Sequence, residues 1–265
     1  MKITVLVDNR SIPGFAAEFG LSLLLEHERE TWLFDTGAGT ALTCNLKQCG
    51  IPPEGIRKMI LSHGHYDHSG GLAKLRPEEI WCCRGILAGH YSRHADSSVH
   101  QIAMPEDSQT VFRKTRIHWT DHFLQLENGW FLTGPIPRHS GEDCGGDFYH
   151  DECCRTPDDV PEEQALLTPD GMLITGCCHA GIINTVEYCR KIHPEIPVRA
   201  VMGGLHLKNA DPARLKRTAE FFRTSEIRNL YLLHCTGEAA VEYLQTELSG
   251  CRVLSPAPGE SIIPG

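Results

Sequence analysis

SHGHYDHSGGL, residues 62–72, is the stretch that decides the fold and the chemistry of this chain. It places His63, His65, Asp67 and His68 in an H-x-H-x-D-H arrangement, so four side chains that can bind a metal lie within six residues. In an extended segment residues 63 and 65 point the same way, so their two imidazoles can hold one ion. As the backbone turns, Asp67 and His68 can reach a second ion. The pattern predicts a metal-binding loop rather than a polar loop that happens to be rich in histidine.

The segments on either side of this loop predict a strand before it and a helix after it. Residues 57–61 (RKMIL) are mostly apolar and indicate a short buried strand, and residues 70–75 look like the start of a helix. A loop between two regular elements can hold side chains rigidly, and Gly64, Gly70 and Gly71 give its backbone the freedom to turn. Imidazole and carboxylate ligands favour Zn, Mn or Fe over Ca or Mg alone.

Length and composition indicate a globular chain of one large domain or two small ones, with 265 residues, 41% of them hydrophobic and 22% charged. A net charge of −9 without a block of Lys or Arg argues against nucleic acid as the main partner. The sequence has no apolar run of about 18 residues and no charged-then-apolar leader, so we expect a cytoplasmic protein that does not bind a membrane. The twelve cysteines are expected to be reduced thiols, because no signal peptide precedes them.

Hydrophobic periodicity predicts an alternation of strands and helices along the chain. Strands are expected at residues 2–8, 20–26, 31–35, 80–83, 198–202 and 230–233, and helices at 41–48, 182–192, 212–224 and 238–248. Two hairpins are expected, at residues 122–134 and 163–176, around the turn sequences ENG and PDG. We expect residues 85–121 to form loops or short helices over the mouth of the site, and residues 142–163 to be an acidic inserted surface loop.

Three motifs together resemble those of the metallo-β-lactamase superfamily. The first is the histidine-rich stretch itself, the second is Phe34-Asp35-Thr36-Gly37 at the end of a strand, and the third is Leu233-His234-Cys235. The resemblance runs from about residue 3 to about residue 240. It implies a single domain over residues 1–265 with an α/β fold, the αββα four-layer sandwich of two β-sheets with helices outside. It also implies an enzyme with two divalent metal ions, Zn in the first place and Mn or Fe as alternatives.

Further motifs resemble the subgroup that contains 7,8-dihydropterin-6-methyl-4-(β-D-ribofuranosyl)-aminobenzene-5′-phosphate synthase. They are Asp8-Asn9, Glu18–Ser22, Gly134–Arg138 (GPIPR), Glu163–Leu166 (EQAL), Gly176–Asn184 (GCCHAGIIN), Gly203–Leu207 (GGLHL) and His234–Gly237 (HCTG). Phe19 stands where the subgroup has His, and Pro135 stands where it has Glu. If those positions touch substrate, the substrate of this chain differs from that of the named synthase.

The resemblance implies a set of six metal ligands, which are His63, His65, Asp67, His68, His179 and His234. Most superfamily members have an Asp on the strand that leads to His179, and its carboxylate bridges both metals. Here the matching residue is taken to be an imidazole, so the ligands divide as His63, His65 and His179 on one ion and Asp67, His68 and His234 on the other.

Asp35 has two interpretations, which are compatible. It can accept a hydrogen bond from a ligand histidine and fix the ring, or it can cap the helix that follows. By resemblance the first role is preferred.

Arg138, His206 and Asn184 are the candidate substrate-binding residues. Arg138 lies where other members bring a third His to the first metal; an arginine cannot bind a metal, but it can clamp a phosphate or a carboxylate. The alternative is a surface arginine in a proline-rich loop. His206 ends another strand and could bind substrate, act as acid or base, or bind the first metal, unless it is a core histidine paired to backbone. Asp67 and His206 are the candidate catalytic residues, and Asn184 is a polar support.

The sequence favours a metal-dependent hydrolase that acts on a phosphate-containing or other anionic small molecule through a metal-bound hydroxide. The alternative is a dihydropterin synthase-like transferase that joins a pterin diphosphate to an aminobenzoate riboside phosphate and releases diphosphate. A non-catalytic metal or redox protein that uses the cysteines ranks last, because no thiol is expected with the ligand set. Assembly into a homo-oligomer is left open.

Overall fold

The computed structural model describes residues 1–28, 30–143 and 145–264, and the chain forms two compact units. The first unit comprises Met1–Trp119, Asp147–Asp158 and the segment from Pro256 onwards, and the second comprises Thr120–Gly146 and Asp159–Ser255. The chain thus leaves the first unit twice and returns to it twice. The single domain over residues 1–265 stays a prediction, and each unit is described by itself.

Seven strands form the large sheet of the first unit. In pairing order they are β17 (Ser261–Ile262), β1 (Lys2–Val7), β2 (Ser22–His27), β3 (Glu30–Phe34), β4 (Lys58–Ile60), β5 (Glu79–Cys82) and β8 (Arg116–Trp119). Neighbours from β17 to β3 are antiparallel, and neighbours from β3 to β8 are parallel. The carboxyl ends of β3, β4 and β5 therefore meet at one edge of this sheet.

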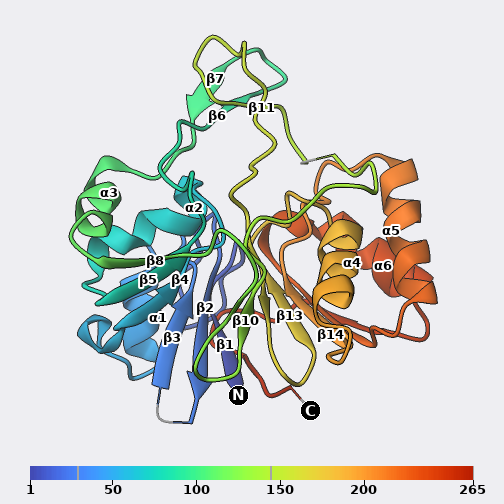
Figure 1. Ribbon diagram of the computed structural model, residues 1–265, viewed down its shortest axis with the longest axis horizontal. Helices are drawn as coiled ribbons and strands as arrows, with labels where there is room; N and C mark the ends of the chain where they lie inside the picture. Colours follow the sequence, from blue (N-terminus) through green and yellow to red (C-terminus); the bar gives the residue numbers. More distant parts are fainter. Residues whose placement is uncertain (29, 144, 265) are drawn as a thin grey trace. The chain divides into compact units, whose positions relative to one another are not determined.

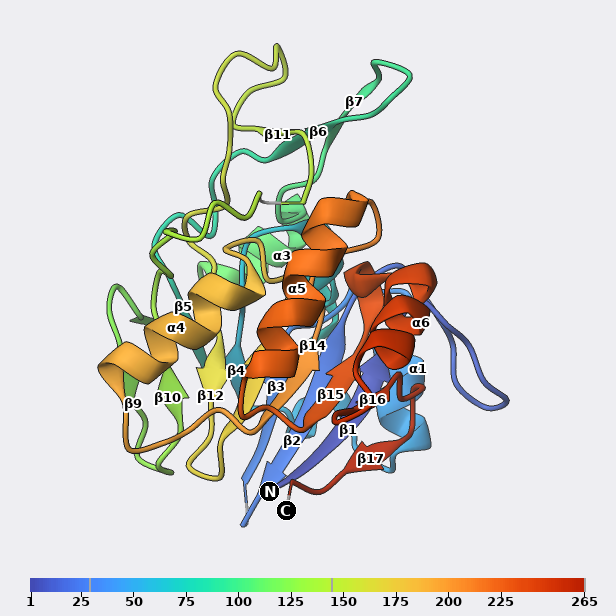
Figure 2. The same ribbon diagram turned by 90° about the vertical axis from the view of Figure 1, so that its right-hand side faces the viewer.

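Short helices cover this sheet and carry the loops at its edge. They are α1 (Leu42–Gln48), α2 (Tyr66–Ser69) and α3 (Glu106–Phe112), with 3₁₀ turns η1 (Pro53–Gly55) and η2 (Gly70–Lys74). Leu42 and Leu46 of α1 and Phe112 of α3 join Leu33 and Ile80 of the strands in one buried apolar cluster. A small three-stranded sheet of β6 (Tyr91–Arg93), β7 (Val99–Gln101) and β11 (Phe148–Tyr149) lies apart from the large sheet in both views (Figures 1 and 2).

The second unit has a seven-stranded sheet of the same kind. In pairing order its strands are β16 (Arg252–Leu254), β15 (Asn229–Leu232), β14 (Ala200–Gly203), β13 (Met172–Thr175), β12 (Leu166–Leu167), β10 (Phe131–Leu132) and β9 (Leu124–Gln125). The strands β13 to β16 are parallel to one another, and the pairs from β13 to β9 are antiparallel. The ends of β13, β14 and β15 thus meet at one edge, as in the first unit.

Three helices lie on one side of the second sheet: α4 (Ile182–Ile192), α5 (Pro212–Thr224) and α6 (Glu238–Glu247) (Figure 2). Val186, Phe222 and Leu244, one from each helix, join Val201 and Leu232 of the strands in a buried apolar cluster. Helix α5 begins where Pro follows Asp211, whose carboxylate accepts a hydrogen bond from the backbone nitrogen of Arg214 at 2.7 Å.

The α/β fold class is confirmed, and the helices predicted at residues 182–192 and 212–224 have the predicted bounds. Two predictions are wrong. Residues 85–121 contain strands β6, β7 and β8 besides helix α3, and residues 142–163 are not simply a surface loop, because β11 pairs with β6. Strands of two to four residues are too short to give a clear periodic signal. Within the described ranges, the cysteines form no disulfide and no helix is long and apolar enough to cross a membrane.

Candidate functional site

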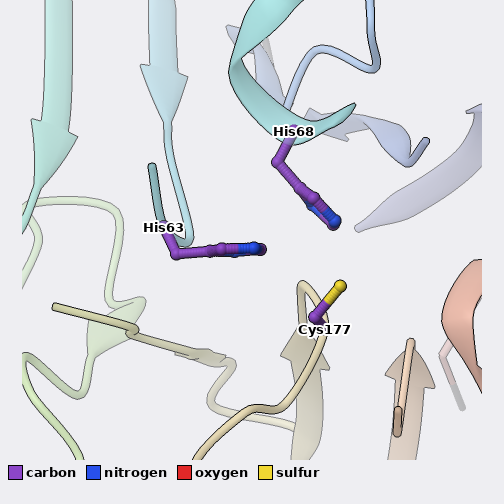
Figure 3. Close-up of side chains that lie close together, drawn as sticks. All are labelled: His63, His68 and Cys177. Atoms are coloured by element: carbon purple, nitrogen blue, oxygen red, sulfur yellow. The ribbon is translucent and has the colours of Figure 1, made fainter. Parts of the chain in front are cut away.

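The histidine loop, residues 62–72, follows strand β4 and gathers its metal-competent side chains in the first unit. His63 and His68 are fully buried, His65 is 4% exposed, and Asp67 is 6% exposed. The ring centroid of His63 lies 4.6 Å from that of His65 and 4.3 Å from that of His68. Figure 3 shows the rings of His63 and His68 extending toward a common space. The loop therefore presents three close imidazoles and a carboxylate, as the spacing predicts.

Asp35, at the end of the neighbouring parallel strand β3, fixes the ring of His68. Its Oδ2 lies 2.7 Å from Nδ1 of His68, and both side chains are fully buried. A carboxylate can only accept, so Nδ1 of His68 donates and Nε2 carries the lone pair that can bind a metal. The backbone nitrogen of Ser62 donates to Oδ1 of Asp35 at 2.7 Å, and its hydroxyl donates to Oδ2 at 2.6 Å. The same hydroxyl lies 2.9 Å from Nδ1 of His63, so one network reaches two rings.

Two glycines let the turn after β3 approach the histidine loop. A Cβ atom on Gly71 would lie 2.1 Å from the carbonyl oxygen of Thr36, and one on Gly70 would lie 2.6 Å from the carbonyl oxygen of Ala38. Neither distance is compatible with a side chain. The backbone nitrogen of Thr36 also donates to the carbonyl of His68 at 2.7 Å. The glycines of the motif thus serve the contact that holds Asp35 beside His68.

The second unit gathers its candidate ligands at the carboxyl ends of three parallel strands. Cys177 and His179 follow β13, His206 follows β14, and His234 and Cys235 follow β15. Two groups of donor atoms each lie within 4.8 Å of one another: Cys177 with His179 and His206, and Cys177 with His234 and Cys235. The rings of His179 and His206 are 4.7 Å apart. Residues 176–181 are called the thiol turn below.

Glu163 and Arg138 hold the backbone of the thiol turn from two sides. The carboxylate of Glu163 accepts hydrogen bonds from the backbone nitrogens of His179 and Ala180, both at 2.7 Å. Burial raises the pKa of Glu163 to about 7, against the lowering effect of these two donors. The guanidinium of Arg138 donates to the carbonyl of His179 at 2.6 Å and to the carbonyl of Asp159. The position of His179 is therefore set through its own peptide groups.

Arg138 and Asn184 make backbone contacts in the structure, and their predicted roles toward substrate stay predictions. Two of the five N–H donors of a guanidinium are used by the carbonyls just described, so Arg138 has further donors for an anion. The Asn184 side chain accepts from the backbone nitrogens of His139 and Ser140 at 2.7 and 2.8 Å, and donates to the carbonyl of Ala180 at 2.7 Å. It thereby ties residues 139–140 to the start of α4. His206 is half-buried.

The sequence prediction missed two features of these clusters. We expected no thiol with the ligands, yet Cys177 belongs to both groups of the second unit. The sequence signal that could have revealed Cys177 as a candidate ligand was its position directly after a strand and two residues before His179. The other feature is a buried pair in the first unit, in which Nδ1 of His90 lies 2.5 Å from Oδ2 of Asp158. The donor atoms of this pair and of His65 lie within 4.8 Å of one another. Nothing in the local sequence connects two residues 68 positions apart.

The donor set of each unit fits a transition-metal ion. The first unit offers imidazoles and a carboxylate, and the second offers imidazoles and thiols, nearly all of them buried. These are the ligand types of Zn and Fe rather than of Ca or Mg. His68 already has the carboxylate partner that orients ligand histidines in metalloproteins. The identity and number of the ions, and the division of the six predicted ligands between them, stay predictions.

Comparison with known proteins places the chain in a family. The model of the metallo-beta-lactamase superfamily matches residues 16–152, just over half of the chain. An uncharacterized protein of Methanocaldococcus jannaschii is 29% identical over 245 residues, which cover 91% of this chain and 93% of the relative. The 7,8-dihydropterin-6-methyl-4-(beta-D-ribofuranosyl)-aminobenzene-5′-phosphate synthase of the same organism is 27% identical over 260 residues, which cover 88% of this chain and 86% of the synthase.

A solved structure agrees with these relatives. The crystal structure of a metal-dependent hydrolase of the beta-lactamase superfamily superimposes with a TM-score of 0.85 at 27% identity, over 99% of this chain and 98% of that chain. Sequence motifs, strand topology and both kinds of comparison agree, and the chain belongs to the metallo-beta-lactamase superfamily.

Proposed function

We propose that the chain is a metal-dependent hydrolase that acts on a phosphate-containing or other anionic small molecule. The observation that carries this proposal is the buried histidine loop, in which Asp35 turns the Nε2 atom of His68 toward the neighbouring imidazoles. Such an arrangement of buried imidazoles has little structural purpose, because apolar residues would fill the same space at lower cost. Similarity to a metal-dependent hydrolase over nearly the whole chain supports it.

The proposed chemistry divides between the metals and the chain. Bound divalent ions lower the pKa of water and polarise the bond that is attacked. His63, His65, His68, His179 and His234 are proposed to hold these ions. Oδ2 of Asp67 lies 3.7 Å from Nε2 of His68, and this carboxylate is proposed to bind the same ion and to take up the proton of the attacking water. His206, half-buried beside His179, is the proposed proton donor to the leaving group.

Arg138 is proposed to bind the anionic part of the substrate. Its guanidinium is held in place by two carbonyls and keeps donors in a planar fork that matches a phosphate. An anionic small molecule is therefore the proposed partner. A cytoplasmic location and homo-oligomer formation stay predictions.

A second function is supported by one relative. The synthase from Methanocaldococcus jannaschii is 27% identical over most of both chains, which supports the alternative of a transferase that joins a pterin diphosphate to an aminobenzoate riboside phosphate. In that reaction the metals and Arg138 would bind the diphosphate leaving group. The substitutions Phe19 and Pro135 in the motifs of this subgroup favour a different substrate.

Product analysis separates the two functions. Metal-loaded protein is incubated with a phosphodiester, with a lactone, and with a pterin diphosphate plus its aminobenzoate acceptor. Hydrolysis that stops on chelation supports the hydrolase, whereas a carbon–carbon bonded product with free diphosphate identifies the transferase.

Arg138→Ala should raise the KM for the anionic substrate by roughly ten- to a hundredfold while metal content stays the same. His139→Ala, at an exposed neighbour, is the matched control. An unchanged KM in Arg138→Ala contradicts the proposed contact, and chemistry that continues at full rate in metal-free protein contradicts the function.

A further inference from the structure

We propose that Cys177 is a metal ligand, and that its thiolate is shared by the two histidine-containing groups of the second unit. The inference rests on the proposed metal-dependent function and adds a ligand that is absent from the predicted set of six. It also changes the expected chemistry of the site, because sulfur selects a different range of metals from imidazole and carboxylate alone.

The position of Cys177 carries the argument. Cys177 follows β13, and its sulfur lies within 4.8 Å of the donor atoms of His179 and His206, and also of those of His234 and Cys235. It is only 2% exposed. Ligands in open α/β sheets gather at the carboxyl ends of adjacent parallel strands, and β13 lies beside β14, which lies beside β15. Because Cys177 is common to both groups, its sulfur is the donor best placed to bind a metal ion together with the histidines of either group.

Charge gives a second reason for a thiolate at this place. Ligand imidazoles are neutral, so His179 and His234 cannot offset the charge of a divalent ion. Glu163 packs against the thiol turn, but each of its two carboxylate oxygens accepts a backbone hydrogen bond there. An anionic donor among the described side chains of these two groups must therefore be a cysteine, and a bound thiol loses its proton to become one.

The two neighbouring cysteines serve for comparison with Cys177. The sulfur of Cys178 lies 3.6 Å from the hydroxyl of Thr185 in helix α4, and burial raises the pKa of this thiol. The thiol of Cys235 donates to the backbone carbonyl of Cys177 at 3.6 Å. Cys178 is thus a matched control one residue away, and Cys235 is the competing candidate. Thiolate coordination favours Zn, Fe or Co over Mn and Mg.

Cobalt reports sulfur ligation directly, because a thiolate bound to Co²⁺ gives charge-transfer absorption in the near ultraviolet. Protein prepared without air is stripped of metal and titrated with Co²⁺ alone. The wild type, Cys178→Ser and Cys235→Ser should show the absorption, and Cys177→Ser should lose most of it. Cys177→Asp, which supplies another anionic donor, should keep cobalt bound without the absorption.

The outcomes are distinct. Cobalt binding with d–d bands but no charge transfer in the wild type overturns the role of Cys177 and leaves the proposed function standing. Loss of the absorption in Cys235→Ser but not in Cys177→Ser also overturns it. Absence of cobalt binding to the wild type overturns both.

X-ray absorption of the zinc-loaded wild type does not depend on how a variant folds. It should show a sulfur neighbour at about 2.3 Å, which Cys235→Ser retains. Only nitrogen and oxygen neighbours, at about 2.0–2.1 Å, would contradict the proposal.

Discussion

The histidine loop of the first unit and the thiol turn of the second occupy the same place in their sheets but are built differently. Each follows a strand that pairs in parallel with the next strand of its sheet, β4 with β5 and β13 with β14. The histidine loop supplies its donors within six residues, whereas the second cluster takes them from three turns, with Cys177 and Cys235 58 positions apart. In the first, a side-chain carboxylate fixes a ring; in the second, Glu163 fixes the backbone. The comparison shows that a cluster of metal-competent side chains can come from one contiguous motif or from several turns that the sheet brings together.

Backbone conformation is what the two regions share. Asp35 (φ 57°), Cys178 (φ 60°), His206 (φ 48°) and His234 (φ 50°) all have the left-handed conformation that favours glycine. Each lies just after a strand that ends at its candidate cluster. Residues with side chains keep such a conformation only where the surrounding structure compensates its cost, as at binding sites.

The largest effect should come from removing the carboxylate that orients the histidine loop. Asp35→Ala leaves buried donors of Ser62 and His68 without their acceptor, at about 1–3 kcal/mol for each group. We expect the free energy of unfolding to fall by at least about 3 kcal/mol, and metal affinity to fall roughly ten- to a hundredfold. Denaturant unfolding and competition with a chelator measure the two quantities.

The matched variant in the other region is Glu163→Gln, which keeps one oxygen acceptor for the backbone of the thiol turn and replaces the other by an NH2 group. Its metal affinity should change less than that of Asp35→Ala. Equal losses would mean that the two regions are held in the same way, against the comparison drawn above.

A smaller effect is expected where two glycines let chains approach closely. Gly71→Ala would press a methyl group against the carbonyl of Thr36 at 2.1 Å, and Gly204→Ala against the sulfur of Cys235 at 2.4 Å and the carbonyl of Gly176 at 2.6 Å. Overpacking typically costs about 1–3 kcal/mol, and Gly71→Ala should cost more, because its contact with backbone is the shorter one. Thermal unfolding measures both.

Gly250→Ala is the control for both glycine variants, since nothing lies within 4 Å of a Cβ atom there. Its stability should stay within about 0.5 kcal/mol of the wild type. A Gly71→Ala protein as stable as Gly250→Ala would show that the turn after β3 does not press on the histidine loop.

The smallest effect should follow from Arg138→Lys. Lysine keeps the charge but lacks the planar fork that reaches the carbonyls of His179 and Asp159. Losing one of two neutral acceptors should cost about 1 kcal/mol of stability, with metal content unchanged. Binding of inorganic phosphate, measured by calorimetry, should weaken more than stability does. If phosphate binds equally well to the wild type and to Arg138→Lys, the guanidinium holds the thiol turn and nothing else.

The features that could be predicted from the sequence are those that lie within one contiguous segment. The histidine loop was readable because its donors are contiguous, and Asp35 because it ends an apolar strand. The helices at residues 182–192 and 212–224 were readable because their apolar positions repeat with the helical period.

The rest depends on contacts between distant positions. No thiol was expected with the ligands, and Cys177 joins them only because β13, β14 and β15 bring the turns that follow them together. His90 lies in a segment expected to form loops or short helices, yet it is fully buried against Asp158, which belongs to a segment expected to be a surface loop. Strand order, which brings such residues together, leaves no mark on local composition.

Metal content tests the central claim most directly. Elemental analysis of the purified wild type should find a transition metal, and the double variant His65→Ala, His68→Ala should lose most of it. The control is His94→Ala, His100→Ala, which removes two exposed histidines whose rings lie 4.8 Å apart in the same unit. The control should keep its metal. Unchanged metal content in the His65→Ala, His68→Ala protein would contradict the assignment of the histidine loop as a metal-binding site.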